Sequence, residues 1–187
     1  IGDWSFAVWH PAKKTLFLAR DHFGNTGLYY YADTHRFAFA SDRKALLALG
    51  IPRRLNEFYL ACGLISWPAH HGPQTIELDL HRLPPAHTLI LKNSNVQTSQ
   101  YWRLEDIPEL HLKKPRDYVD GFLELYDRAV RDRLRSHRPV GVTLSGGLDS
   151  GSITALAARA LHEQGTRLAA YTSIPLYDVS NTIDGNR

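Results

Sequence analysis

The spacing of hydrophobic positions divides this chain near residue 110. In the first part, short runs of aromatic and aliphatic residues alternate with turn residues, a pattern typical of antiparallel strands joined by hairpins. Strands are predicted over residues 4–9, 15–20, 28–31, 36–40, 87–91 and 96–101. Short helices are predicted over 42–49, capped by Ser41, and over 55–61, capped by Asn56. The aromatic residues of these strands are expected to form a core rather than a platform for stacked bases.

After residue 110 the pattern changes to long helices that alternate with single strands. Residues 140–144 predict a buried strand, and apolar positions from Ile153 to Leu161 predict a helix that ends at Gly165. A further strand is predicted over 167–174. A long helix precedes them, with one apolar face made of Val119, Phe122, Tyr126 and Val130. This alternation predicts a parallel α/β sheet.

The six residues Ser145 to Ser150, SGGLDS, interrupt the pattern between that strand and its helix. Gly146 and Gly147 can adopt positive φ and leave no Cβ in the way of a ligand. The amides of such a loop and of the first helical turn then point to one place, where the helix dipole favours negative charge. The hydroxyls of Ser145 and Ser150 add donors at the two edges. The loop is therefore expected to bind phosphate.

Two common phosphate-binding motifs do not fit this loop. The Walker loop needs a lysine before its last hydroxyl residue, and none lies in the loop or the following helix. The dinucleotide fingerprint needs three spaced glycines, whereas this loop has two adjacent ones. The loop instead resembles the SGGxDS pyrophosphate loop of ATP pyrophosphatases, which cleave ATP between its α and β phosphates.

Composition excludes some classes of protein. The 187 residues are 43% hydrophobic and 22% charged, which is typical of a globular chain, and the net charge is +3. No apolar run approaches the roughly 20 residues of a membrane span. The single cysteine, Cys62, cannot form an internal disulfide and indicates a reducing, cytoplasmic setting; it is expected to be a buried, inert thiol. The absence of methionine and the start within a predicted hairpin suggest an internal piece of a longer protein.

The order of these segments resembles the family of glutamine-hydrolysing asparagine synthetases. GDWSFAVW, LARDHFGNTGLYYY, FASDRKALL, LPPAH and a later YW are similar to segments of that family, and SGGLDS is similar to its ATP loop. His22-Phe23 and Asn25-Thr26 depart from the more usual residues at positions expected to be structural. The resemblance implies an α+β part with the antiparallel sheets of N-terminal-nucleophile enzymes, then an α/β ATP pyrophosphatase part with a parallel sheet. The implied divisions are a glutamine amidotransferase portion (1–105), a linker (106–115) and a synthetase portion (116–187).

The resemblance also implies a reaction. Glutamine hydrolysis supplies ammonia, ATP adenylates the side chain of aspartate, and ammonia displaces AMP to give asparagine. ATP and Mg²⁺ are the implied cofactors, and a homodimer is possible. The implied nucleophile is the family's first residue, a cysteine that does not occur in this chain, and Cys62 cannot substitute for it. The implied nucleotide site consists of Leu144, Ser145, Gly146, Gly147, Asp149 and Ser150, with Thr172 or Ser173 against adenine and Asp149 as a metal ligand.

Three other interpretations remain open. A β-lactam synthetase or lasso-peptide cyclase has the same layout but acts on another carboxylate and uses an internal amine. A nucleotide-binding remnant would lack turnover. A nucleic-acid binder is suggested by Arg128, Arg131, Arg133, Arg135 and Arg138. Acidic residues interleave with these arginines, so a solvated helix face is the simpler interpretation.

Overall fold

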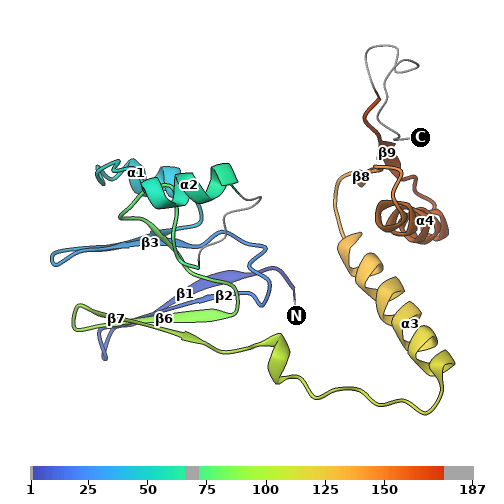
Figure 1. Ribbon diagram of the computed structural model, residues 1–187, viewed down its shortest axis with the longest axis horizontal. Helices are drawn as coiled ribbons and strands as arrows, with labels where there is room; N and C mark the ends of the chain where they lie inside the picture. Colours follow the sequence, from blue (N-terminus) through green and yellow to red (C-terminus); the bar gives the residue numbers. More distant parts are fainter. Residues whose placement is uncertain (1, 66–71, 175–187) are drawn as a thin grey trace. The chain divides into compact units, whose positions relative to one another are not determined.

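The computed structural model describes residues 2–65 and 72–174, and the chain divides into two compact units, residues 1–109 and 110–187. The first unit contains β1 (Ser5–His10), β2 (Thr15–Arg20), β3 (Tyr29–Ala32), β4 (Phe37–Ala40), α1 (Arg43–Leu47), α2 (Glu57–Ile65), β5 (His81–Arg82), β6 (His87–Lys92), β7 (Asn95–Gln100) and the 3₁₀ turn η1 (Leu104–Asp106). The second contains α3 (Pro115–Arg133), β8 (Gly141–Thr143), α4 (Leu148–Glu163) and β9 (Ala169–Tyr171) (Figure 1).

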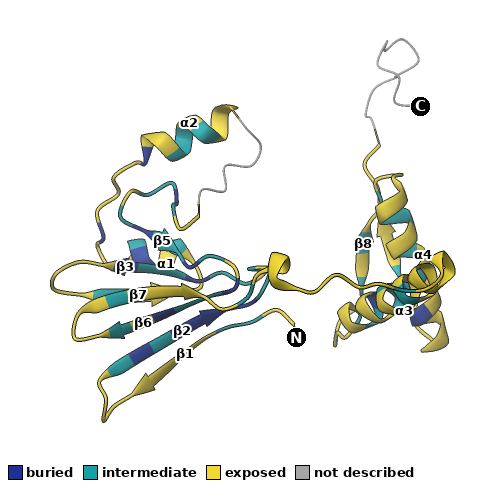
Figure 2. Ribbon diagram, turned by 60° about the horizontal axis from the view of Figure 1, so that its bottom comes forward, coloured by how far each residue is buried: buried dark blue, intermediate teal, exposed yellow. Residues whose placement is uncertain are grey.

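Two antiparallel sheets form the centre of the first unit. One has the order β1-β2-β6-β7 and the other β4-β3-β5. Side chains of both sheets meet in one hydrophobic core, to which Tyr30 of β3 and Phe37 of β4 contribute from the smaller sheet. In Figure 2 the strongest burial in the larger sheet lies along β2. The buried members of this core are Leu16, Leu18, Leu28, Leu83 and Leu89.

The other face of the smaller sheet packs on α1. Successive side chains of a strand point to opposite faces, so Tyr31 leaves the first core and joins a second one with Leu46 of α1. Ile51 and Leu80 complete that core. The first unit is thus layered as sheet, sheet and helix.

Two buried charged side chains, Arg20 and Asp21, hold the loop that connects β2 to β3. The carboxylate of Asp21, which is 1% exposed, accepts hydrogen bonds from the amides of Phe23, Asn25 and Thr26 and from the Thr26 hydroxyl. The guanidinium of Arg20 donates to three backbone carbonyls, including that of Leu83 in the segment before β6. Because all but one of these partner groups, the Thr26 hydroxyl, are main-chain atoms, the loop conformation depends on Arg20 and Asp21 more than on its other side chains.

Several local predictions for the first unit need correction. Asp42, not Ser41, caps α1, because its carboxylate accepts from the amide of Lys44 at 2.8 Å. The predicted cap Asn56 is confirmed, since its side chain accepts from the amide of Tyr59. Cys62 is only half-buried, because α2 has no buried residue among those described. The aromatic core is confirmed for Tyr30 and Tyr31 but not for every ring of the predicted strands; the exposed ones are Phe6, Trp9, Phe39 and Tyr101.

In the second unit, α3 and α4 pack together and β8 pairs with β9 in parallel. The α4 helix ends in a Schellman motif: the amide of Gly165, at φ +72°, donates to the His162 carbonyl, and that of Thr166 donates to Leu161. The prediction of a buried strand is wrong for β8 among the described residues, because Gly141 and Thr143 are exposed and Val142 is half-buried. A parallel strand becomes buried when layers cover both faces of its sheet, and here β8 pairs only with β9.

The described fold is a mixture of helices and strands with antiparallel sheets. No helix within residues 2–65 and 72–174 has the length and apolar character that crossing a membrane requires. The tail after Ile174 lies outside the described residues.

Candidate nucleotide-binding loop

The SGGLDS segment joins β8 to α4, as the periodicity predicts, but the helix begins earlier. It starts at Leu148, with Gly147 as its N-cap in an extended conformation at φ −79°. The first helical hydrogen bond runs from the amide of Gly151 to the carbonyl of Gly147 at 3.0 Å. Leu148, Asp149 and Ser150 therefore form the first turn of α4, and their amides have no partner within the helix.

Gly146 shapes the turn before the helix. It adopts φ +83°, in the left-handed region that side chains disfavour. A Cβ built at this position would have no atom within 4 Å, and one built at Gly147 would lie 3.6 Å from the Ser145 hydroxyl. Position 146 therefore favours glycine because of its backbone conformation. A side-chain Cβ would not clash with protein atoms at either position.

The two serines of the loop bind each other. The amide of Ser145 donates to the Ser150 hydroxyl oxygen at 3.1 Å, and the two hydroxyl oxygens lie 2.9 Å apart. The Ser150 hydroxyl donates in turn to the carbonyl of Gly147 at 3.2 Å. These bonds hold the loop closed, a role that the sequence analysis did not assign to them.

The open side of the loop is lined by backbone. Ser145, Gly146, Gly147, Leu148 and Asp149 are all exposed, and no hydrogen bond among the described residues uses the amides of Gly146 or Gly147. Together with the first-turn amides of α4, these are donors that an anion at a helix N-terminus could use.

The parallel pairing brings a second segment to the same edge. Because Thr143 pairs with Tyr171, the residues that follow both strands lie at one end of this small sheet. The amide of Leu144 donates to the carbonyl of Tyr171 at 2.8 Å, which places Thr172 next to the start of the loop. Thr172 and Ser173 are both exposed, and the structure does not select between them.

Asp149 is the one carboxylate within the loop. It lies in the first turn of α4, where the helix dipole favours a negative charge. Within residues 2–65 and 72–174 there is no cluster of three His, Cys, Asp or Glu side chains that could hold a metal ion. Any ion at Asp149 would need oxygen ligands from a bound substrate, which is the usual way in which Mg²⁺ binds at phosphate sites.

A neighbour that the sequence analysis left out is Leu148. Its side chain is 91% exposed at the tip of the loop, between two predicted site residues. The sequence contained a sign of this feature, because Leu148 is the only residue of SGGLDS with a large apolar side chain.

Arg131, one of the clustered arginines of α3, makes ion pairs with the protein itself. Arg131 donates to Asp127 at 2.6 Å and to Glu163 of α4 at 2.8 Å, and Arg159 of α4 reaches the same Asp127 at 2.9 Å. Hydrogen bonds from Arg131 first, and then from Arg159, lower the pKa of Asp127. This network joins the two helices and favours a solvated structural face over a surface for nucleic acid.

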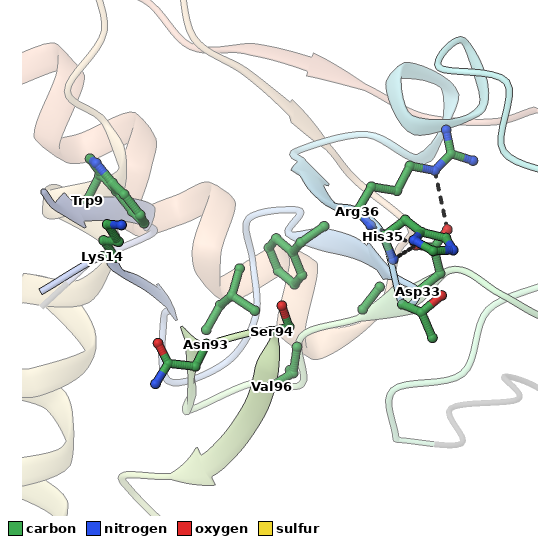
Figure 3. A pocket seen from close by; sticks show the side chains of 12 residues that line it. Trp9, Lys14, Asp33, His35, Arg36, Asn93, Ser94 and Val96 are labelled. Carbon is green, nitrogen blue, oxygen red and sulfur yellow. Dashed lines mark hydrogen bonds and ion pairs between the residues drawn. The ribbon is translucent and has the colours of Figure 1, made fainter.

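A cavity in the first unit contains none of the predicted site residues. It lies between the turns of three hairpins, and its labelled residues in Figure 3 include Lys14, His35 and Arg36. The carboxylate of Asp33 there already accepts bonds from the amides of His35 and Arg36 and from the Tyr31 hydroxyl. Those bonds, the His35 amide foremost, lower the pKa of Asp33 to about 2. The carboxylate of this cavity is therefore already engaged by the protein.

Two family models match the chain: a glutamine amidotransferase domain over residues 1–102 and an asparagine synthase over 121–177. The chain is 34% identical over 161 residues to a putative glutamine-hydrolysing asparagine synthetase 2 of Methanocaldococcus jannaschii, covering 81% of the chain and 30% of that protein. It is 33% identical over 165 residues to asparagine synthetase 3 of Bacillus subtilis, covering 88% and 26%. It is 31% identical over 176 residues to amidase chry2 of Gibberella zeae, covering 92% and 26%. The chain thus spans less than a third of the length of these relatives.

Proposed function

The chain belongs to the family of glutamine-hydrolysing asparagine synthetases, and we propose from this premise that the whole protein uses ATP to convert a carboxylate into an amide. The carboxylate is the side chain of aspartate, and glutamine supplies the ammonia. ATP transfers its AMP group to the carboxylate, pyrophosphate leaves, and ammonia then displaces AMP. In this proposal β8 and β9 belong to the parallel sheet of an ATP pyrophosphatase domain.

One observation carries the nucleotide part of the proposal: the unpaired amides of Gly146 and Gly147 lie next to the first turn of α4. Negative charge grows on the β-phosphate while the bond to the α-phosphate breaks. Donors that are already in place stabilise that charge without reorganising during the reaction. The Ser145–Ser150 bonds keep those donors oriented.

The remaining predicted residues have more peripheral roles. The segment at Thr172 and Ser173, beside Leu144, would contact the adenine end of ATP. Asp149 would hold Mg²⁺ together with phosphate oxygens, and when bound that ion neutralises part of the phosphate charge. In this chain Asp149 lies in the first turn of α4, two residues after Gly147.

Exchange of labelled pyrophosphate into ATP by the full-length protein tests this function. We expect exchange that depends on aspartate, because only formation of the adenylate makes the pyrophosphate release reversible. Absence of exchange with aspartate, under conditions where ATP binds, would contradict the assignment.

A second candidate differs in its carboxylate. Amidase chry2 matches 92% of the chain at 31% identity, close to the values for the two asparagine synthetases. Identity at this level does not distinguish aspartate from another acid. Pyrophosphate exchange driven by a different carboxylate, and not by aspartate, would favour this alternative. The homodimer, the cytoplasmic setting and the glutamine requirement stay predictions that gel filtration, cell fractionation and a glutaminase assay would test.

A further inference from the structure

A cavity of ≈ 460 Å³ lies in the second unit, at the opposite end of the β8–β9 pair from the SGGLDS loop. The two strands are parallel, so the segments that precede them meet at one edge, where the amide of Ala169 donates to the carbonyl of Val140 at 3.2 Å. The C-caps of α3 and α4, Leu134 and Gln164, also belong to the wall. The cavity therefore shares no residue with the nucleotide loop.

The ionisable side chains that line this cavity are all basic. They are His137, Arg138 and Arg167, and no aspartate or glutamate belongs to the wall. Neither Arg138 nor Arg167 forms an ion pair with another described residue, whereas Arg131 and Arg159 of the adjacent helices both have carboxylate partners. The positive charge of these two arginines is thus not compensated by the described part of the second unit.

Both arginines are within reach of one ligand. A compact space of this volume is about 10 Å across, and spaces of a few hundred Å³ are typical of sites for small molecules. Arg138 and Arg167 are exposed, so their guanidinium groups can turn into the cavity without breaking an ion pair with a described residue. The Ser136 hydroxyl accepts from the amide of Arg138 at 3.0 Å and keeps its own proton for a ligand.

The helix ends next to the cavity do not cancel this positive charge. A helix C-terminus carries about half a negative charge, against a full positive charge on each guanidinium. In α4 the carbonyls of Leu161 and His162 already accept bonds from the amides of Thr166 and Gly165. An anion beside the two arginines is therefore favoured on balance.

The remaining wall includes an apolar part. Leu134, Pro139, Val140 and Leu161 line it, and Leu161 is 5% exposed. An inorganic anion would gain nothing from these side chains, because it has no apolar surface to remove from water. A ligand that combines a negative group with an apolar one would use both parts of the wall.

We propose that this cavity binds a small organic acid, in which a carboxylate or phosphate group is attached to a compact apolar body. The oxyanion binds between Arg138 and Arg167, whose planar guanidinium groups pair with two oxygens at a time. The apolar body lies against Leu134 and Val140. The site is separate from the nucleotide loop, so the proposal does not depend on the proposed function.

The test is a titration of the full-length protein with benzoate, followed by saturation-transfer NMR in the presence of ATP and Mg²⁺. Benzyl alcohol keeps the ring without the charge, and acetate keeps the charge without the ring. We expect saturable binding of benzoate, and binding at least tenfold weaker for both controls. Phenyl phosphate has the same ring on the other oxyanion, so the tighter of the two acids identifies the group that the site prefers.

Three variants test whether the two arginines hold the probe. Arg138→Gln and Arg167→Gln each remove one charge and should weaken benzoate binding at least tenfold. Arg135→Gln is the matched control, because it removes an exposed arginine that lies three residues before Arg138 but outside the cavity wall; it should leave binding unchanged. All three side chains are exposed, and an unchanged unfolding temperature shows that each variant is folded.

The outcomes that would overturn the proposal are distinct. Equal binding of benzoate and benzyl alcohol would indicate a plain apolar cleft, and equal binding of benzoate and acetate would indicate a plain anion site. Benzoate binding that survives both Arg138→Gln and Arg167→Gln would place the probe elsewhere on the protein. Absence of binding by both benzoate and phenyl phosphate would refute the site.

Discussion

The amide nitrogen of Ser145 lies 3.1 Å from the Ser150 hydroxyl oxygen, to which it donates a hydrogen bond. This bond joins the end of β8 to the first turn of α4 across two glycines. No hydrogen bond among the described residues uses the amides of Gly146 and Gly147 between them.

Gly146→Ala should destabilise the second unit by about 1 kcal/mol, because an alanine at φ +83° occupies the disfavoured left-handed region. Gly147→Ser provides the matched control. Its φ of −79° suits any residue, its added Cβ meets an ordinary contact and serine is a favoured N-cap residue, so its stability should not fall. Urea unfolding of both variants measures this difference. Equal losses would contradict the conformational role given to Gly146.

Ser150→Ala should cost about 1 kcal/mol and loosen the loop, because the alanine neither accepts from the Ser145 amide nor donates to the Gly147 carbonyl. Faster amide hydrogen exchange at Ser145 would report the loosening directly. Ser152→Ala, which removes a bond to Tyr126 of α3 instead, should leave that exchange rate unchanged. If both variants speed exchange at Ser145 alike, the bracing role of Ser150 is wrong.

Gly27→Ala should destabilise the first unit by about 2–3 kcal/mol, because the added Cβ would lie 2.2 Å from the carbonyl oxygen of Ser41 and one backbone segment must move. Gly63→Ala in α2 serves as the control. It meets no atom within 4 Å and replaces a poor helix former, so a gain of up to about 1 kcal/mol is expected. Thermal unfolding of the two variants is the measurement, and a neutral Gly27→Ala would contradict the described packing.

Asp21 should make the first unit sensitive to acid. Burial by itself would raise its pKa, but hydrogen bonds from the amides of Asn25, Thr26 and Phe23 and from the Thr26 hydroxyl lower that pKa to about 2. The unfolded carboxyl, with a pKa of 3.8, binds its proton first as pH falls. The stabilisation, about 2 kcal/mol, is therefore complete above pH 4 and is lost as pH falls through 2.

Unfolding free energies measured between pH 5 and pH 2 test this prediction. Asp21→Asn should be less stable than the natural chain at pH 5, and its stability should depend less on pH. Asp33, whose pKa is also about 2, keeps its own contribution in that variant and so provides an internal reference. An unchanged pH dependence in Asp21→Asn would show that the carboxylate is not held as described.

The local elements could be predicted from the sequence where neighbouring residues determine them. The strand over 15–20 has the predicted bounds, and the left-handed Asn93 and Ser94 form the tip of the predicted hairpin. The apolar period predicts a start of α4 after the SGGLDS loop, whereas the helix begins at Leu148. Polar Asp149 and Ser150 interrupt the apolar period without interrupting the helix. Hydrophobic spacing reports which face is buried and does not report where helical hydrogen bonding begins.

Longer-range features could not be predicted in the same way. The pairing of β2 with β6 joins segments about 70 residues apart, and no local pattern specifies it. The pairing of Ser145 with Ser150 and the presence of Arg138 and Arg167 in one cavity wall also depend on three-dimensional positions. For the loop, the residue types were sufficient to suggest an anion site. They did not indicate that the serine hydroxyls bond to each other while the glycine amides stay without a partner, because that depends on the folded positions of these groups.

The most direct test of the central claim is amide hydrogen exchange of the full-length protein with and without saturating ATP and Mg²⁺. If the backbone of the SGGLDS loop grips the phosphates, the amides of Gly146, Gly147 and Leu148 should exchange at least tenfold more slowly in the presence of ATP. Unchanged exchange at these three amides, while calorimetry shows that ATP is bound, would contradict the account.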